Sequence, residues 1–196
     1  MRGRAAGRFD AAALVLLSCV FLSGAALAQY APPSRYTATL RWYHEEARAG
    51  NPTAQFLLGI KYETGTDVPR DLALAAELFE QAARKGHKDA QFKLASMLEA
   101  GRGIAVDRDA AEALYRAAAF EDHAPAQYNM SLMLLSAARD EDALVEGLSW
   151  LIRAGRGGIS LAEGLLEKWG ETVSENVMAR AGEFSELPLK PEPPVR

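Results

Sequence analysis

The side chains best suited to chemistry in this sequence are three histidines, His44, His87 and His123. A neutral imidazole can bind a metal ion, and histidine exchanges protons near neutral pH. A zinc site needs several ligands at close spacing, whereas His87 and His123 stand 36 residues apart. His44 begins "HEEAR", which lacks the second histidine of the H-E-x-x-H zinc-protease motif. The sequence therefore predicts no metal, no cofactor and no catalytic set, and it favours a turn or helix N-terminus for His87 and His123.

A glutamine followed by an aromatic residue also recurs three times with the same spacing of 36. The three pairs are Gln55 and Phe56, Gln91 and Phe92, and Gln127 and Tyr128. A glutamine side chain donates and accepts hydrogen bonds, so this series could bind the backbone of an extended peptide. Alternatively, each glutamine caps or bridges its own loop. The aromatic series either packs between neighbouring units or forms a ladder on a concave wall. These six residues are the candidate binding surface.

The common spacing reflects a repeat of the sequence as a whole. At an offset of 36, "AQFLLGIKYETG" aligns with "AQFKLASMLEAG", and eleven identical pairs fall without a gap between residues 54–83 and 90–119. A third copy, "AQYNMSLMLLSA", has diverged but remains in register. A period in the thirties is the signature of a helical solenoid, in which stacked neighbours bury the apolar face that one unit cannot bury alone.

Each copy is expected to form two helices. Asn51-Pro52 is a start signal for the first helix, Gly65 ends that helix with a positive φ, and Asp71 begins the second helix. The expected buried face of the first helix recurs at four-residue spacing and consists of Ala54, Leu58 and Tyr62. The second helix carries a buried stripe of Ala75, Leu78, Phe79, Ala82 and Ala83. In the third copy Ala137 replaces the turn glycine, which predicts a different turn there.

The predicted organisation places partial units at both ends of the repeats, as caps that face water on their outer sides. Residues 37–50 match a second helix alone, and 159–187 read as two further helices. The full sequence of segments is a signal peptide at 1–28, a linker at 29–36, the cap at 37–50, repeats at 51–86, 87–122 and 123–158, caps at 159–187 and a proline-rich tail at 188–196.

The repeated residues resemble the Sel-one-like repeat, a relative of the tetratricopeptide repeat. Its pattern is A-x-x-x-L-G-x-x-Y-x-x-G-x-G-V-x-x-D followed by K-A-x-x-W/Y-x-x-A-A-x-x-G. The first copy matches at Ala54, Leu58, Gly59, Tyr62, Gly65, Val68, Asp71, Ala75, Phe79, Ala82, Ala83 and Gly86. The resemblance covers residues 51–158 and implies an all-α, right-handed α-solenoid of antiparallel helix pairs. It also implies a non-enzymatic adaptor or regulator in signalling, secretion or envelope assembly, with a protein or peptide as partner.

The start of the chain predicts export. Residues 1–28 combine a basic beginning, "MRGRAAGR", an apolar run and the small-x-small pattern Ala26-Leu27-Ala28. We expect cleavage after Ala28 and a periplasmic or secreted protein. A retained transmembrane anchor is the alternative, but the run is short and ends in a cleavage pattern. Lipidation of Cys19 is less consistent with the sequence, because it would leave the apolar "VFLSGAALA" on the mature protein.

The composition of the chain after removal of the signal peptide limits the classes of partner that we expect. Cys19 is the single cysteine, so its removal leaves no disulfide to stabilise the fold. Loss of three arginines and one aspartate with the signal peptide moves the formal net charge from −4 to −6. A mildly acidic chain without basic clusters argues against nucleic acid as a partner, and removal of the signal leaves no segment for stable membrane insertion. The remaining length of about 168 residues fits a single domain.

Two other functions stay open on sequence grounds. Some cysteine-rich relatives of this repeat family bind or cleave β-lactams, which suggests an envelope hydrolase, but that branch depends on paired cysteines that the mature chain lacks. Trp42, Trp150 and Trp169 could instead stack on a polysaccharide. Trp42 and Trp150 occupy the packing position of Leu78, so both are predicted to be core residues.

Overall fold

The computed structural model describes residues 37–189, and within this range the chain is helical with no strands. The signal segment 1–28, the linker 29–36 and residues 190–196 of the tail lie outside the described residues.

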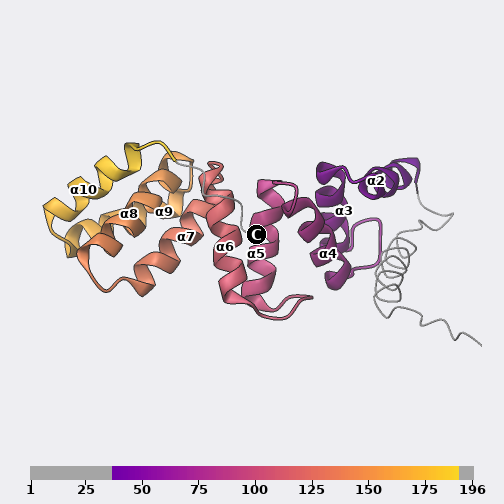
Figure 1. Ribbon diagram of the computed structural model, residues 1–196, viewed down its shortest axis with the longest axis horizontal. Helices are drawn as coiled ribbons and strands as arrows, with labels where there is room; N and C mark the ends of the chain where they lie inside the picture. Colours follow the sequence, from indigo (N-terminus) through magenta and orange to yellow (C-terminus); the bar gives the residue numbers. More distant parts are fainter. Residues whose placement is uncertain (1–36, 190–196) are drawn as a thin grey trace, which may run out of the picture.

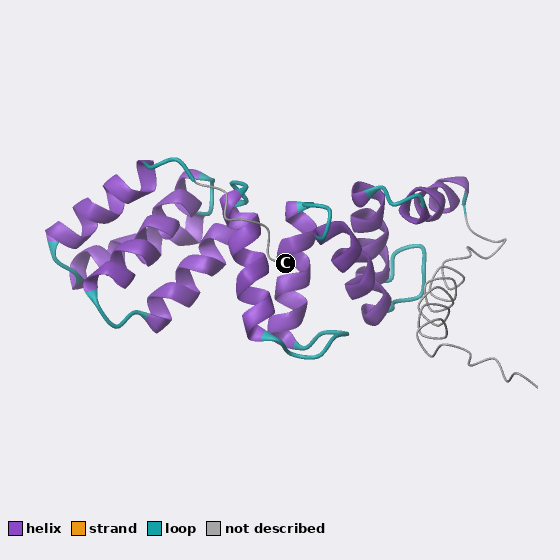
Figure 2. Ribbon diagram, in the orientation of Figure 1, coloured by secondary structure: helices purple, strands orange, loops and turns teal. Residues whose placement is uncertain are grey.

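Figures 1 and 2 show the helices side by side along one long axis, with α2 and α10 at opposite ends. The helices are α2 (Ala38–Arg48), α3 (Pro52–Thr64), α4 (Leu72–Ala83), α5 (Lys88–Ala100), α6 (Arg108–Phe120), α7 (Ala124–Ala137), α8 (Glu141–Arg156), α9 (Ser160–Thr172) and α10 (Glu175–Glu186). The predicted all-α solenoid is confirmed.

Polar side chains begin the first helix of every repeat. Asn51 Oδ1 accepts hydrogen bonds from the backbone N–H groups of residues 53 and 54, and it caps α3. His87 and His123 replace it in the next two repeats, where each Nδ1 accepts from the backbone N–H three residues later, over 3.4 and 3.2 Å. Each cap satisfies a backbone donor that has no partner within its helix. The expected position of both histidines at a helix N-terminus is confirmed.

Glycine ends the first helix where the left-handed conformation is required. Gly65 has φ 76° and Gly101 has φ 66°, which a residue with a Cβ adopts only at a cost. In the third repeat α7 ends at Ala137, and Ala138 has φ −57° and ψ 130°. The chain therefore leaves α7 in an extended conformation, which confirms the prediction of a different turn.

The stacking follows the repeat. Helices pack in pairs within each unit, as α3 with α4, α5 with α6 and α7 with α8, and successive units join through α4 with α5 and α6 with α7. At the start, α2 packs on α3 as the second helix of a unit would. At the other end, α9 and α10 both pack on α8. Helices therefore flank the three repeats on both sides, and the division into caps at 37–50 and 159–187 stays a prediction.

Stability comes from two clusters of buried side chains. The first runs from α2 to α7 and reaches Trp150 on α8, and its fully buried members include Leu58, Phe79 and Tyr115. The second lies between α8, α9 and α10. Burial of each large aliphatic or aromatic side chain stabilises the fold by about 1.5–3 kcal/mol. Gly59 belongs to this packing, because a Cβ there would lie 2.7 Å from a carbon of the Phe79 ring.

Candidate functional site

The three glutamines of the predicted binding surface are buried. Their exposed fractions are 3, 8 and 3 % for Gln55, Gln91 and Gln127. Each side-chain amide donates a hydrogen bond to a carbonyl oxygen near the end of the preceding second helix. The pairs are Gln55 with Ala47 at 3.1 Å, Gln91 with Ala83 at 3.4 Å and Gln127 with Ala119 at 3.2 Å. Each glutamine therefore bonds across the turn that precedes its helix and links neighbouring units. This arrangement agrees with the alternative in which the glutamine bridges a loop, rather than with an exposed peptide-binding side chain.

The aromatic series also lies within the stack. The Phe56 ring stacks on the His87 ring with centroids 4.7 Å apart, and the Phe92 ring lies tilted against the His123 ring with centroids 4.9 Å apart. Tyr128 is partly buried against the second cluster. These contacts correspond to packing between units rather than to a ladder on an open wall. Peptide binding by the six residues as a set stays a prediction.

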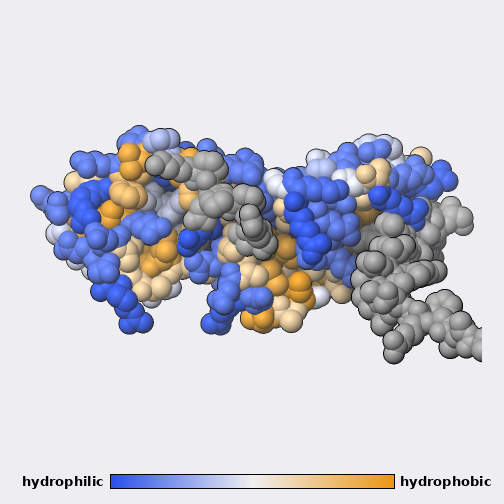
Figure 3. Space-filling view, viewed as in Figure 1, coloured by the Kyte–Doolittle hydropathy of each residue, from blue (hydrophilic) through white to orange (hydrophobic). Residues whose placement is uncertain are grey.

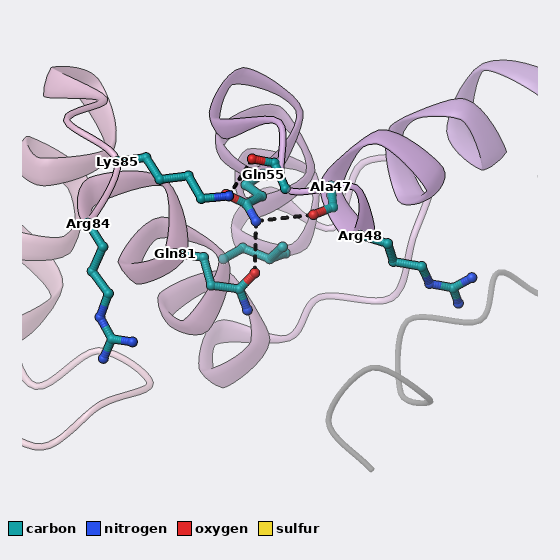
Figure 4. Close-up of a pocket in the computed structure, with 8 residues that line it drawn as sticks. Ala47, Arg48, Gln55, Gln81, Arg84 and Lys85 are labelled. Carbon is teal, nitrogen blue, oxygen red and sulfur yellow. Dashed lines mark hydrogen bonds between the residues drawn. The ribbon is translucent and has the colours of Figure 1, made fainter. Parts of the chain in front are cut away.

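One member of the set, Gln55, lines a pocket of about 310 Å³ between α2, α3 and α4. Figure 4 shows the Gln55 and Gln81 side chains facing each other at its centre, with Lys85 directed toward the turn after α2. Arg48 and Arg84 extend on opposite sides. The pocket is therefore formed where the cap helix meets the first repeat; Lys85 is directed into it, and the Arg48 and Arg84 guanidinium groups point away from the pair of amides.

The hydrogen bonds in the pocket leave one acceptor unused. Gln55 Nε2 donates to Ala47 O and, over 3.0 Å, to Gln81 Oε1, so both of its amide hydrogens are engaged. Gln55 Oε1 is buried and accepts no hydrogen bond from the described residues. A buried acceptor without a donor costs about 1–3 kcal/mol, and Gln91 Oε1 in the second repeat is likewise buried without a donor among the described residues. Lys85 Nζ donates to Gly50 O, and the Arg84 guanidinium lies 2.5 Å from the Glu80 carboxylate.

The second repeat lacks this basic character, whereas the cap and the third repeat share part of it, since Arg48 and Arg156 stand at the position of Arg84. At the corresponding positions of the second repeat, Ala117, Phe120 and Glu121 replace Gln81, Arg84 and Lys85. Sequence reasoning missed the pocket because it followed positions at which the copies agree. The signal that could have found it was a cationic repeat position: Arg48, Arg84 and Arg156 share one position of the repeat, and Phe120 replaces them in the second copy.

The histidines and acidic residues have structural contacts. His123 Nε2 lies 3.2 Å from the Asp89 carboxylate, while burial lowers the pKa of His123 and Asp89 opposes that shift. His44 is buried edge-on to the Tyr62 ring. Between residues 37 and 189 no group of three or more histidine, cysteine or acidic side chains is arranged to hold a metal ion. Over the same range, every helix is too short or too polar to cross a membrane.

The tryptophans do not form a common stacking surface. Trp150 is 6 % exposed, as predicted for a core residue, and Trp169 packs against the second cluster. The prediction for Trp42 was wrong, because this side chain is 51 % exposed. Trp42 lies on α2, the first described helix, and among the described residues no preceding helix covers the position that Leu78 buries in the first repeat. In Figure 3 polar residues cover most of the visible face, and hydrophobic ones gather at the lower edge beneath α5 and α6.

Comparison with known proteins agrees with this architecture. The family model described as Sel1 repeat matches residues 52–87, 88–119 and 124–159. A Sel1 repeat protein from Oxalobacter formigenes superimposes with a TM-score of 0.62 and 27 % identity, over 68 % of this chain and 100 % of that chain. A protective antigen present in uropathogenic Escherichia coli strains, which displays an SLR fold, superimposes with a TM-score of 0.62 and 23 % identity, over 74 % of this chain and 33 % of that chain, and shows the fold alone. No curated protein matches the chain.

Three matched repeats cover more than half of the sequence. The chain belongs to the Sel1 repeat family, whose members generally mediate protein–protein interactions and are typically not enzymes.

Proposed function

We propose that the protein is an exported, non-enzymatic scaffold that binds a partner protein through the pocket of its first repeat. The observation that carries the proposal is the group of basic side chains, Arg48, Arg84 and Lys85, that line the pocket at the junction of α2, α3 and α4. A surface of this kind suits a polypeptide, which offers carboxylates and backbone carbonyl oxygens to basic side chains.

The scaffold holds this pocket in a fixed shape. Ala47, Gln55 and Leu78 are buried, and each comes from a different helix of the first junction. Because these helices pack on one another, the lining residues are positioned before a partner arrives, which reduces the entropy lost on binding. The chain as a whole is acidic, with a net charge of −4, so a local group of cations would orient an acidic segment toward the pocket.

Export is the second part of the proposal and rests on the sequence pattern of residues 1–28. A protein processed at this site would begin at Gln29 and act in the periplasm or outside the cell, where envelope regulation, secretion and assembly take place. Cell fractionation with N-terminal sequencing tests this part. A mature protein that begins at Gln29 outside the cytoplasm is expected, whereas an uncleaved cytoplasmic protein would contradict export.

The binding function is tested by affinity capture with a charge-reversed pocket. The test variant combines Arg84→Glu with Lys85→Glu. The control combines Arg108→Glu with Arg139→Glu, which makes the same change in net charge at exposed residues outside the pocket. Partners captured by the wild type are purified and titrated against all three proteins. We expect the pocket variant alone to lose at least tenfold in affinity; equal affinity, or no specific partner for the wild type, would contradict the proposal.

A further inference from the structure

Helix α10 departs from the packing of the repeats. In each repeat the second helix packs on the first helix of its own unit, whereas α10 packs on α8 and has little contact with α9. In the first repeat, Phe56 and Gly59 of α3 face Phe79 of α4. The corresponding residues of α9, three repeat lengths further on, are Gly164 and Glu167, and neither offers an apolar side chain. Helix α9 therefore lacks the surface on which its own second helix would pack.

Helix α8 offers α10 an apolar surface instead. Val145, Leu148 and Ile152 lie three and four residues apart, so they share one side of α8 and form what we call the α8 stripe. Val145 and Leu148 are buried in the second cluster, and Ile152 packs against it. Helix α10 contributes Val177 and Ala181 to the same cluster and lies alongside α8 (Figure 1). The α8 stripe is therefore a surface for an amphipathic helix, and the chain's own α10 covers it.

The second repeat shows that this burial depends on α10. One repeat length earlier, α6 carries three charged residues at the positions of the α8 stripe, Asp109, Glu112 and Arg116. All three are at least partly exposed, although α7 packs on α6 as α9 packs on α8. A first helix in this place thus leaves the outer side of the preceding second helix open to solvent. The additional cover on α8 comes from α10.

The start of α8 holds α10 through acidic side chains. The Arg180 guanidinium of α10 pairs with the Asp142 carboxylate and lies 3.8 Å from the Glu141 carboxylate. Both carboxylates are exposed and Arg180 is partly exposed. Because water and salt compete with exposed ion pairs, this contact can be broken without opening the core.

The end of α8 holds the last turn of α10 through two arginines. The Arg156 guanidinium lies 2.5 Å from the Glu186 carboxylate, and both side chains are exposed. Arg153 donates hydrogen bonds to the carbonyl oxygens of Phe184, over 3.3 Å, and Leu187. Carbonyl groups at the end of a helix lack the usual helical partner, and Arg153 supplies one from α8. Polar contacts therefore fasten α10 to both ends of α8.

The apolar contacts of α10 are few compared with those of the repeat helices. Its buried aliphatic residues are Val177 and Ala181, with Met178 partly buried, whereas the large side chain of Phe184 is exposed. Hydrophobic stabilisation scales with the apolar area removed from water, so polar contacts carry a large share of the attachment of α10. The two residues between α9 and α10, 173–174, are extended, so α10 can leave α8 as one unit while α9 stays in place.

We infer that α10 is a releasable latch over the α8 stripe, and that its release exposes a binding surface for an amphipathic helix of a partner protein. The partner helix has the pattern of α10, in which aliphatic residues four positions apart cover Val145 and Leu148 and a basic residue meets the acidic start of α8. A second copy is a poorer occupant, because its α10 already covers its own α8. This surface is separate from the first-repeat pocket, and the inference does not rest on the proposed function.

Hydrogen exchange in the full chain tests the latch. Arg180→Asp places a carboxylate next to Asp142, and we expect the amides of residues 178–186 to exchange at least tenfold faster than in the wild type. Asp142→Arg combined with Arg180→Asp swaps the two charges and should restore the exchange to within threefold of the wild type. The control Arg108→Asp makes the same change in net charge as Arg180→Asp at an exposed residue of α6 and should leave this exchange unchanged.

Exchange in α3 to α6 should be the same in all variants, which shows that the repeats stay folded. Unchanged exchange of α10 in Arg180→Asp, or no recovery after the charge swap, would overturn the latch.

A peptide with the sequence of α10 tests the surface beneath it. A fluorescent peptide of residues 173–189, VSENVMARAGEFSELPL, is titrated against the full-length variants by fluorescence anisotropy. We expect Arg180→Asp to bind the peptide at least tenfold more tightly than the wild type or Arg108→Asp, because its own α10 competes less. Replacing the valine at position 177 of the peptide with aspartate should weaken this binding at least tenfold.

Three results would overturn the binding surface. They are no binding of the peptide to Arg180→Asp, equal binding to Arg180→Asp and the wild type, and equal binding of the peptide with aspartate at position 177. Light scattering gives the mass of each variant in the same samples. Self-association of Arg180→Asp in place of peptide binding would assign the α8 stripe to a second copy and contradict the inference of a partner helix.

Discussion

The side-chain amide of Gln127, in the first turn of α7, donates a hydrogen bond to the carbonyl oxygen of Ala119 in the last turn of α6, over 3.2 Å. The same amide lies 3.3 Å from the Asp122 carboxylate in the turn between the helices. The last carbonyls of a helix lack the usual helical partner, and Ala119 O instead accepts from the Asp122 N–H of the turn and from Gln127 of the next repeat. Equivalent bonds at Gln55 and Gln91 make the glutamine a structural joint between units.

Loss of this joint should destabilise the stack. Gln127→Ala removes one of two donors to the buried carbonyl of Ala119, because the Asp122 N–H also donates to it, and should lower the free energy of unfolding by about 0.5–1.5 kcal/mol. The matched control is Ser136→Ala, an exposed position on the same helix, for which a change within about 0.5 kcal/mol is expected. Urea unfolding followed by circular dichroism measures both. Equal effects of the two substitutions would contradict a structural role for Gln127.

Two ion pairs of Glu63 link the first repeat to the second. Its carboxylate is 9 % exposed and lies 2.9 Å from Lys93 Nζ and 3.0 Å from the Arg102 guanidinium, both in the second repeat. The cations are partly exposed, so solvent weakens the pairs, and Glu63→Ala should cost about 1–2 kcal/mol, below the value for a fully buried pair. Glu112→Ala breaks a pair within one exposed helix surface and should cost about 0.5 kcal/mol or less. Chemical unfolding of both variants at low and high salt measures these losses of unfolding free energy. We expect the larger loss for Glu63→Ala, with part of it remaining at high salt; equal losses in the two variants would contradict this role of Glu63.

Two tryptophans at corresponding positions provide a test of the capping model. Trp150 packs within the first core cluster, and its ring meets the Phe120 ring edge-on with centroids 5.3 Å apart. Trp150→Ala should therefore cost about 3–5 kcal/mol, as for other buried aromatic residues. Trp42→Ala, on the uncovered face of the cap, should cost about 1 kcal/mol or less. Thermal melting would contradict the capping model if the two variants lost similar stability.

Acid should weaken the junction between the second and third repeats through His123. Its neutral Nδ1 caps α7, and burial holds the pKa of His123 below its usual value of 6.5 in the folded protein. The unfolded chain therefore takes up this proton first as the pH falls. The contribution of neutral His123 to stability is fully present above about pH 6.5 and is lost as the pH falls toward the folded pKa.

The substitution His123→Asn isolates this effect, because asparagine keeps a capping oxygen, as Asn51 does in the first repeat. Between about pH 7.5 and pH 5.5, we expect the melting temperature of the wild type to fall more than that of His123→Asn. Parallel melting temperatures across this range would show that His123 has no part in the acid sensitivity.

The sequence was sufficient to predict the structural features that one repeat shares with the next. The period of 36, the capping Asn51, and the left-handed Gly65 and Gly101 each follow from local chemistry, and they placed the helices correctly. Gln55 remained ambiguous, because an amide that can bind a peptide can also bind a carbonyl, and only the distance to Ala47 separates the two uses.

Features that depend on a unit's position in the stack could not be predicted from the repeated sequence pattern. Trp42 has the pattern of a core residue, but among the described residues no helix precedes α2 to cover it. Arg48 and Arg84 share one position of the repeat, but only the packing of α2 and α4 against α3 places them at the same pocket. Both cases required the stacking of helices that are distant in sequence.

The most direct test of the central claim is site-specific photo-crosslinking in cells that make the protein. A photoreactive residue replaces Gln81 inside the pocket or Leu161, an exposed residue on α9, and crosslinked proteins are identified by mass spectrometry. If the first repeat is the binding site, a defined partner is crosslinked from position 81 and not from position 161, and Arg84→Glu with Lys85→Glu abolishes it. The absence of any adduct from position 81, or the same adducts from both positions, would contradict the account.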